Sequence, residues 1–225
     1  MRTEALGTSY VAGPDGSGPF PGLVVVHELF GLNAHIRDIC RRFAAQGYVA
    51  LGVDLFAGHN KAICMARMFV GAMLGDLNYY GVASLKAALS QLGQRPDVDG
   101  NRIGAVGFCL GGSVVLTWAC TDRRLKAIAP YYGLAPRSKE AIRRLCPVVG
   151  SWPGRDFTTG AAATIEAELS VTGTPHDVKV YPGTKHAFFN DTISAYDAAA
   201  AADSWQRVLA FFGEHVKRGG TEPSK

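Results

Sequence analysis

The sequence has no long hydrophobic run, no closely paired cysteines and no large excess of one charge. The longest strongly apolar run, residues 23–26, is far too short to cross a bilayer, and residues 1–4 do not lead into a signal-peptide segment. The five cysteines are odd in number, widely spaced and free of any C-x-x-C pattern, which argues against a disulfide framework and a zinc site. We therefore expect a cytoplasmic protein that does not contact a membrane.

The charge balance also argues against a nucleic-acid partner. Lys and Arg number 23 against 19 Asp and Glu, a formal net charge of +4. The basic residues occur as scattered pairs, such as Arg41 with Arg42, whereas nucleic-acid binding needs a clustered basic face. The expected partner is a small molecule, and we expect the protein to be a monomer or a weak homo-oligomer.

Short β-branched runs alternate with helix-like stretches along the chain. The strand-like runs are 22–27, 48–53, 102–106, 126–129, 147–150 and 177–181, and the helix-like stretches are 34–46, 61–93, 111–121, 160–172 and 193–217. This alternation predicts an α/β fold with a mostly parallel sheet covered by helices on both faces. At 225 residues we expect one domain, 1–225, with a peripheral strand and loop before residue 22 and a frayed tail from about Gly219.

The most informative motif is Gly-Phe-Cys-Leu-Gly-Gly at residues 107–112, between a predicted strand and a predicted helix. A nucleophile on such a sharp turn needs small residues two positions to either side, and Gly107 and Gly111 meet this need. The helix N-terminus favours the thiolate form of Cys109, and the N–H of Leu110 is a natural oxyanion donor. The alternative is a buried structural cysteine, which is how we interpret the other four cysteines.

Asp156 and His186 follow Cys109 in the order nucleophile, acid, base that this strand-to-helix turn favours. Each lies after a predicted strand and a Pro-Gly turn. Because the carboxyl ends of parallel strands meet at one edge of a sheet, the three side chains can converge. Taken alone, Asp156 is also typical of a turn or a helix cap, and His186 of an ordinary loop histidine. Their order and placement together favour a triad.

Glu28 directly follows the first buried strand, where a carboxylate is costly to bury without a partner. A hydrogen bond to the backbone or to an arginine is one structural explanation. The backbone N–H of the next residue, Leu29, is a candidate for the second oxyanion donor. The loop after this strand is therefore predicted to belong to the site.

Three motifs together resemble the dienelactone hydrolase family. They are His-Glu-Leu-Phe-Gly at 27–31, the turn at 107–112, and Tyr-Pro-Gly-Thr-Lys-His-Ala-Phe at 181–188. The similarity runs from about residue 20 to about residue 215, and the combination of the first two motifs is specific.

The resemblance implies an α/β-hydrolase fold and hydrolysis of a lactone or related carboxylic ester through an acyl-enzyme. It implies a triad of Cys109, Asp156 and His186, and a cysteine-activating Glu28 that hydrogen-bonds the thiol in the resting site. It implies no cofactor and no metal. The residues by themselves indicate only a hydrolase with a cysteine nucleophile.

Two positions depart from the family pattern. Members that cleave dienelactone carry an arginine four residues after the catalytic histidine, which holds the substrate carboxylate, and Asn190 stands at that position here. The only candidate for a second substrate-binding arginine is Arg67. We therefore expect neutral substrates to gain relative to anionic ones.

Two other functions remain open at this point. One is a binding or regulatory protein that keeps the scaffold without turnover. The other is a metallohydrolase that uses His27, His59 and His186, although these residues lack the spacing of metal ligands.

Overall fold

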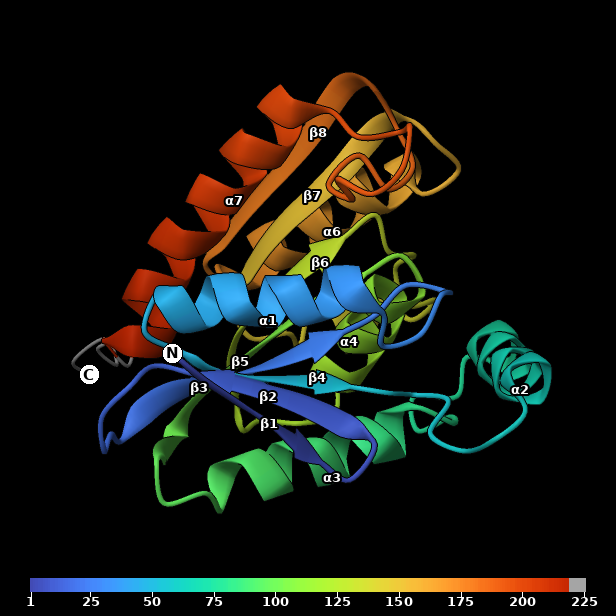
Figure 1. The fold of residues 1–225 in the computed structure, drawn as a ribbon. Coiled ribbons are helices and arrows are strands. Elements are labelled where there is room, and N and C mark those ends of the chain that lie inside the picture. Colours follow the sequence, from blue (N-terminus) through green and yellow to red (C-terminus); the bar gives the residue numbers. More distant parts are fainter. Residues whose placement is uncertain (219–225) are drawn as a thin grey trace.

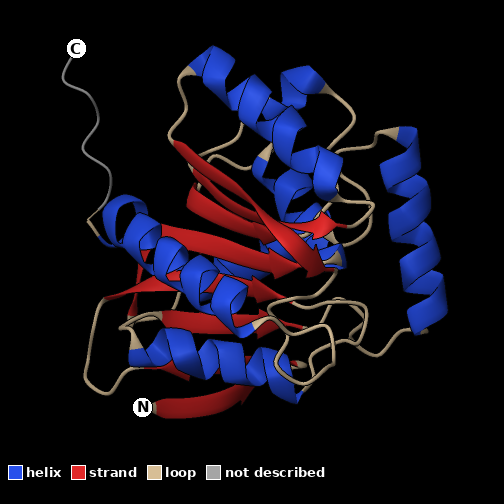
Figure 2. Ribbon diagram, turned by 90° about the horizontal axis from the view of Figure 1, so that it is seen from above, coloured by secondary structure: helices blue, strands red, loops and turns tan. Residues whose placement is uncertain are grey.

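The computed structural model describes residues 1–218 and contains one eight-stranded sheet between two layers of helices (Figures 1 and 2). The strands are β1 (Arg2–Leu6), β2 (Ser9–Gly13), β3 (Phe20–Val26), β4 (Val49–Val53), β5 (Val98–Phe108), β6 (Leu125–Tyr131), β7 (Val148–Arg155) and β8 (His176–Lys185). The helices are α1 (Ala34–Ala45), α2 (Lys61–Leu74), α3 (Val82–Gly93), α4 (Leu110–Ala119), α5 (Lys139–Ile142), α6 (Thr159–Thr172) and α7 (Ala198–Phe212), followed by the π-helical turn η1 (Gly213–Lys217). The predicted frayed tail lies outside the described residues.

The strand order is β1-β2-β4-β3-β5-β6-β7-β8. The strands from β3 to β8 pair in parallel, and β2 joins β4 in antiparallel orientation with β1 outside it. The predicted mostly parallel sheet is confirmed. Its carboxyl edge collects the loops that follow β3, β5, β6, β7 and β8.

Strand β3 shows why the strands of the sheet are continuous runs of apolar residues in the sequence. Residues 23–26 are completely buried. Val24 and Val26 belong to the core on the side of α3, α4 and α6, whereas Leu23 and Val25 belong to the core on the side of α1 and α7. Because both faces of the strand are covered, no polar alternation is possible.

Three boundaries differ from the sequence prediction. The stretch 61–93 forms two helices, because Gly75 ends α2 in the left-handed conformation, at φ +71°. The last helix begins only at Ala198, where the Asp197 side chain accepts a hydrogen bond from the Ala200 N–H and caps it. The N-terminal stretch contains a hairpin of two strands in place of one strand and a loop.

Helix α2 stands beyond the carboxyl ends of β3 and β4, apart from the two helix layers (Figures 1 and 2). Only Cys64 and Met68 of this helix are buried. Within residues 1–218, no helix combines the length and apolar character needed to span a membrane.

Candidate active site

Cys109 occupies the sharp turn between β5 and α4. Its backbone is in the left-handed region, at φ +55°, and its N–H donates to the Tyr131 carbonyl at 3.0 Å. A Cβ on Gly107 would lie 2.3 Å from the Gly111 carbonyl oxygen, and one on Gly111 would lie 2.5 Å from the Val26 carbonyl oxygen. Both glycines are therefore required for the turn to pack against itself and against the end of β3.

The two predicted oxyanion donors lie in neighbouring loops. Leu110 is the first residue of α4, so its N–H has no acceptor within the helix. Leu29 lies in the loop after β3, and its side chain lines the same cavity as that of Leu110. The ends of β3 and β5, which are neighbours in the sheet, thus bring the two residues to one place.

Asp156 and His186 pair directly. His186 Nδ1 is hydrogen-bonded to Asp156 Oδ2, with the carboxylate side chain 1% exposed and the imidazole 30% exposed. The residues follow the adjacent parallel strands β7 and β8. The Phe157 ring stacks on the imidazole with 5.4 Å between ring centroids, and the ring of Tyr132 lies 5.0 Å away. The imidazole is therefore oriented from several sides, with Nδ1 engaged and Nε2 left for proton transfer.

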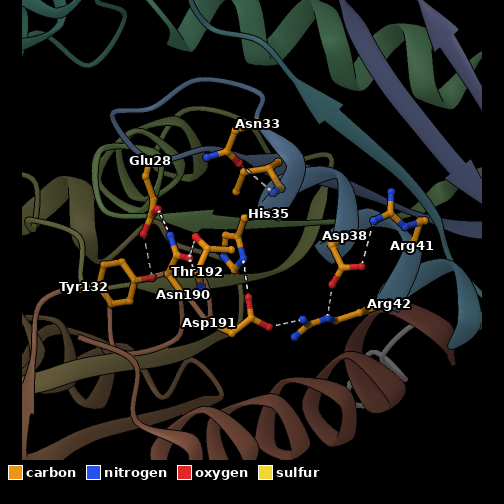
Figure 3. Close-up of polar contacts among 11 residues, drawn as sticks. Glu28, Asn33, His35, Asp38, Arg41, Arg42, Tyr132, Asn190, Asp191 and Thr192 are labelled. Carbon is orange, nitrogen blue, oxygen red and sulfur yellow. Dashed lines mark hydrogen bonds and ion pairs between the residues drawn. The ribbon is translucent and has the colours of Figure 1, made fainter. Parts of the chain in front are cut away.

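Glu28 is buried at the same edge and accepts two hydrogen bonds (Figure 3). Tyr132 Oη donates to Oε1 at 3.2 Å, and Asn190 Nδ2 donates to Oε2 at 2.7 Å. Within residues 1–218 these are its side-chain partners, and the Cys109 thiol is not one of them. The contact between Glu28 and the cysteine that the resemblance implies is therefore replaced by a contact with two neutral donors.

The Asn190 side chain points into the interior of the protein. Its side chain is buried, and its Oδ1 accepts from the Thr192 N–H at 3.0 Å and the Thr192 hydroxyl at 2.6 Å, while its amide holds Glu28. Arg67 lies with its guanidinium 4.9 Å from the Tyr80 ring centre, beside a separate cavity of about 380 Å³. The Asn190 side chain is thus fully engaged within the protein, and Arg67 is not among the residues that line the main cavity.

With this geometry in place, comparison with known proteins identifies the family. A family model for the dienelactone hydrolase family matches residues 8–216. The chain belongs to the dienelactone hydrolase family. A Yersinia pestis relative named as a carboxymethylenebutenolidase is 32% identical over 222 residues, covering 92% of this chain and 83% of the relative. A Synechocystis protein of the same name is 30% identical over 226 residues, covering 92% of each chain.

Solved structures agree with this membership. A Klebsiella pneumoniae protein described as a dienelactone hydrolase superposes with a TM-score of 0.78 at 27% identity, covering 91% of this chain and 92% of that one. A dienelactone hydrolase-like promiscuous phosphotriesterase from metagenomic libraries superposes with a TM-score of 0.76 at 27% identity, covering 92% of each chain. The α/β-hydrolase fold is confirmed, and the protein is a hydrolase.

In this family member the loop after β8 is tied to helix α1 (Figure 3). The Asp191 carboxylate accepts from Arg42, whose Nε also donates to Asp38 at 2.5 Å. His35 Nδ1 lies 3.3 Å from the other Asp191 oxygen. These contacts fix the segment that directly follows His186 and carries Asn190.

The surroundings of Cys109 favour the thiol form over the thiolate. Burial raises its pKa to about 11, the charges of Glu28 and Asp156 raise it further, and the Leu110 N–H acts in the opposite direction. These effects act against the thiolate preference expected at the helix N-terminus, because burial and the two nearby carboxylates disfavour the charged form.

A cavity of about 500 Å³ adjoins this edge of the sheet. It lies between α2, the first turns of α4 and the segment after β6, and Leu29 and Leu110 line it. Leu29 and Leu110, the two predicted oxyanion donors, are among its lining residues, whereas Cys109 and His186 are not.

The described residues form no group of three His, Cys, Asp or Glu side chains suited to a metal. His27 is buried, with Nε2 accepting from the Leu55 N–H at 3.0 Å and Nδ1 2.5 Å from the Glu28 carbonyl oxygen. Its two nitrogens are thus engaged in holding the loop after β3 against the loop after β4.

Sequence reasoning missed Tyr132 in the site. The residue follows β6 directly and has φ +40°, so it carries the same strand-end placement that identified the other site residues. Within residues 1–218, the non-glycine residues with positive φ are Cys109, Tyr132 and Ala187, and all lie at this edge. Residues with strained backbone conformations are commonly found at functional sites.

Proposed function

We propose that this protein hydrolyses carboxylic esters or lactones, with Cys109 as nucleophile, His186 as general base and acid, and Asp156 as the orienting group. The observation that carries the proposal is the buried Asp156 hydrogen-bonded to His186 Nδ1, at the same edge of the sheet as a cysteine on a strained turn. The names of the relatives and solved neighbours support the same substrate class.

In the first half-reaction the thiol proton passes to His186 Nε2 as sulfur forms a bond to the acyl carbon. The carbonyl π electrons move to oxygen, and the N–H groups of Leu29 and Leu110 stabilise the resulting oxyanion. The intermediate collapses with cleavage of the carbon–oxygen bond, and the imidazolium gives its proton to the leaving alkoxide. A thioester and a free alcohol result, or in a lactone a thioester that still carries the hydroxyl.

In the second half-reaction water attacks the thioester while His186 accepts its proton. The carbon–sulfur bond breaks, the thiolate regains the proton from the imidazolium, and the carboxylic acid leaves. In this proposal the raised pKa of Cys109 means that the thiol passes its proton to His186 during the attack on the carbonyl. In this proposal Glu28 keeps the free enzyme in the thiol form.

Replacing the nucleophile tests the proposal. Cys109→Ala is expected to lose turnover of p-nitrophenyl acetate by at least about a thousandfold, the scale seen when a triad member is removed. Cys120→Ala is the matched control, because Cys120 is buried at the C-terminal end of α4, away from the strand-to-helix turn, and this variant should stay within a few-fold of the parent.

Two outcomes would contradict the proposal. Retained turnover in Cys109→Ala would show that another group attacks the ester. Stoichiometric labelling of Cys109 by a thiol reagent without turnover of any ester in the parent protein would favour the binding-protein alternative.

We also propose a reducing, cytoplasmic location and a monomeric or weakly associated state. All five cysteines are free thiols, which suits a compartment that does not form disulfides.

A further inference from the structure

The 500 Å³ cavity next to the oxyanion donors is apolar over most of its wall. One face of α2 contributes Ala62, Met65, Ala66 and Phe69, which recur at helical spacing. Leu110 and Leu134 close it from the side of α4 and the segment after β6. The volume lies within the range of sites for small organic ligands, about 300 to 1,000 Å³.

Two of the hydroxyl groups in the wall, those of Ser113 and Thr117, are already hydrogen-bonded within the protein. Ser113 Oγ donates to the Cys109 carbonyl at 3.2 Å and accepts from the Leu134 N–H at 2.8 Å. Thr117 Oγ1 donates to the Ser113 carbonyl at 3.1 Å. Neither hydroxyl is therefore aimed at a ligand, and the wall presents mainly carbon and sulfur.

The charged residues of the wall do not form an anion site. They are Asp76 and Arg137, one of each sign, and both are exposed at the surface. Arg67, the candidate for a substrate-binding arginine, packs on the Tyr80 ring, and Asn190, at the position where dienelactone-cleaving members carry an arginine, is bonded to Glu28. A carboxylate in the depth of this cavity would lose its hydration without gaining a buried cation.

The geometry of attack by the Cys109 sulfur determines which part of the substrate enters the cavity. The tetrahedral carbon carries the Cys109 sulfur, the oxyanion, the leaving oxygen and the acyl substituent. The leaving oxygen must face His186, which takes part in proton transfer and does not line the cavity. The acyl substituent is left to pass over Leu110 into the cavity.

We propose that this cavity is the acyl subsite and that the substrate is an ester or lactone whose acyl part is an uncharged hydrocarbon chain of several carbons. The proposal rests on the function proposed above and adds the substrate class. Met65 and Met68 give the wall flexible, polarisable surface that adapts to chains of different shape.

The first test varies chain length on each side of the ester. In p-nitrophenyl esters from acetate to octanoate, kcat/KM should rise about two- to fourfold per added methylene until the cavity is filled. In alkyl acetates from methyl to hexyl it should stay nearly flat. A flat acyl series, or a steep alcohol series beside a flat acyl series, would overturn the assignment.

The second test varies charge at constant length. The p-nitrophenyl ester of hexanoic acid should exceed the p-nitrophenyl monoester of adipic acid in kcat/KM by at least about tenfold, because a carboxylate in this wall has no buried cation. A preference for the adipate monoester would contradict the uncharged chain.

The third test fills the cavity. Ala66→Trp should lower the octanoate-to-acetate ratio of kcat/KM by at least about tenfold. Ile63→Trp is the matched control on the same helix, because Ile63 is exposed and does not line the cavity, and it should keep the parent ratio. Equal changes in both variants, or none in either, would overturn the proposal.

These tests separate the inference from the proposed function. Turnover of the acetate ester that depends on Cys109, together with no chain-length preference, leaves the hydrolase intact and removes the acyl subsite. Turnover that persists in Cys109→Ala removes the hydrolase mechanism itself.

Discussion

Glu28 shows how one side chain can set the state of a neighbouring nucleophile without touching it. Its carboxylate is buried, receives neutral donors from Tyr132 and Asn190, and carries a charge that raises the pKa of the Cys109 thiol. A charge held by neutral donors is stabilised but not cancelled, so its field still reaches the sulfur. Burial and this charge both favour the thiol form of Cys109, which reacts more slowly with electrophiles than the thiolate does.

Alkylation measures this effect. With a thiol pKa of about 11, labelling of Cys109 by iodoacetamide should rise about tenfold per pH unit from about pH 7 to pH 10, because only the thiolate reacts. Glu28→Gln should move the profile to lower pH, since removing a nearby negative charge favours the thiolate. Peptide mass spectrometry follows residue 109 separately.

The exposed Glu140 provides the control, and Glu140→Gln should leave the profile of Cys109 unchanged. A parent midpoint below about pH 8, or a Glu28→Gln midpoint above that of the parent, would contradict the assignment of charges in the site.

The three residues of the proposed triad could be placed at one edge of the sheet from the sequence, because each directly follows a strand. The contacts of Asn190 could not be predicted, because its position four residues after His186 does not show whether the side chain faces the cavity or the core. The loop after β8 turns it inward, where Asp197 N–H donates to the Phe188 carbonyl at 2.9 Å and closes the segment. An arginine at position 190 would place a buried positive charge beside the Glu28 carboxylate.

At the scale of elements, Arg207 joins α7 to the two strands that carry Asp156 and His186. Its Nε donates to Asp177 Oδ2 at 2.9 Å, and its Nη1 donates to the Ser151 hydroxyl at 3.2 Å and the Tyr181 hydroxyl at 3.0 Å. Its Nη2 reaches the Asp177 carbonyl at 2.8 Å and the Gly150 carbonyl at 3.3 Å. One guanidinium thus fixes β7, β8 and α7 relative to one another.

Arg207→Ala should lower the free energy of unfolding by about 2 kcal/mol, because hydrogen bonds from a charged donor contribute about 1.5 to 3 kcal/mol and several acceptors here are buried. Arg207→Lys should recover less than half of that loss, because one ammonium group cannot reproduce the hydrogen bonds that the planar guanidinium donates from three nitrogens. Urea unfolding followed by circular dichroism gives the values.

Lys126→Ala, at an exposed position on β6, should change stability by less than about 0.5 kcal/mol. If Arg207→Lys matched the parent, charge alone would explain the contribution, and the geometric role of Arg207 would be wrong.

Across the whole molecule, the site is assembled by topology more than by any one element. Glu28, Cys109, Tyr132, Asp156 and His186 follow five different strands, and the parallel order of these strands brings their ends to one edge. The sequence predicted this edge because strand patterns and strand ends are local. It did not predict the separate position of α2, because α2 is apolar over most of its surface and its pattern does not mark which face meets the cavity.

That position gives α2 a different stability from the rest of the fold. Two of its residues are buried, against eight of the ten residues of α4. Few buried contacts mean a small free energy for local opening. Amide hydrogen exchange in 61–74 should therefore be faster than in 110–119 by at least about tenfold.

Adding 2-octanone, a neutral carbonyl compound with a six-carbon chain, should slow exchange in α2 by stabilising its packed state. Acetone at the same concentration should not, and α1, which does not line the cavity, should not respond to either compound. Exchange in α2 as slow as in α4 would contradict the low local stability of α2. Equal slowing of α1 and α2 by 2-octanone would show that the compound does not act through the cavity that α2 lines.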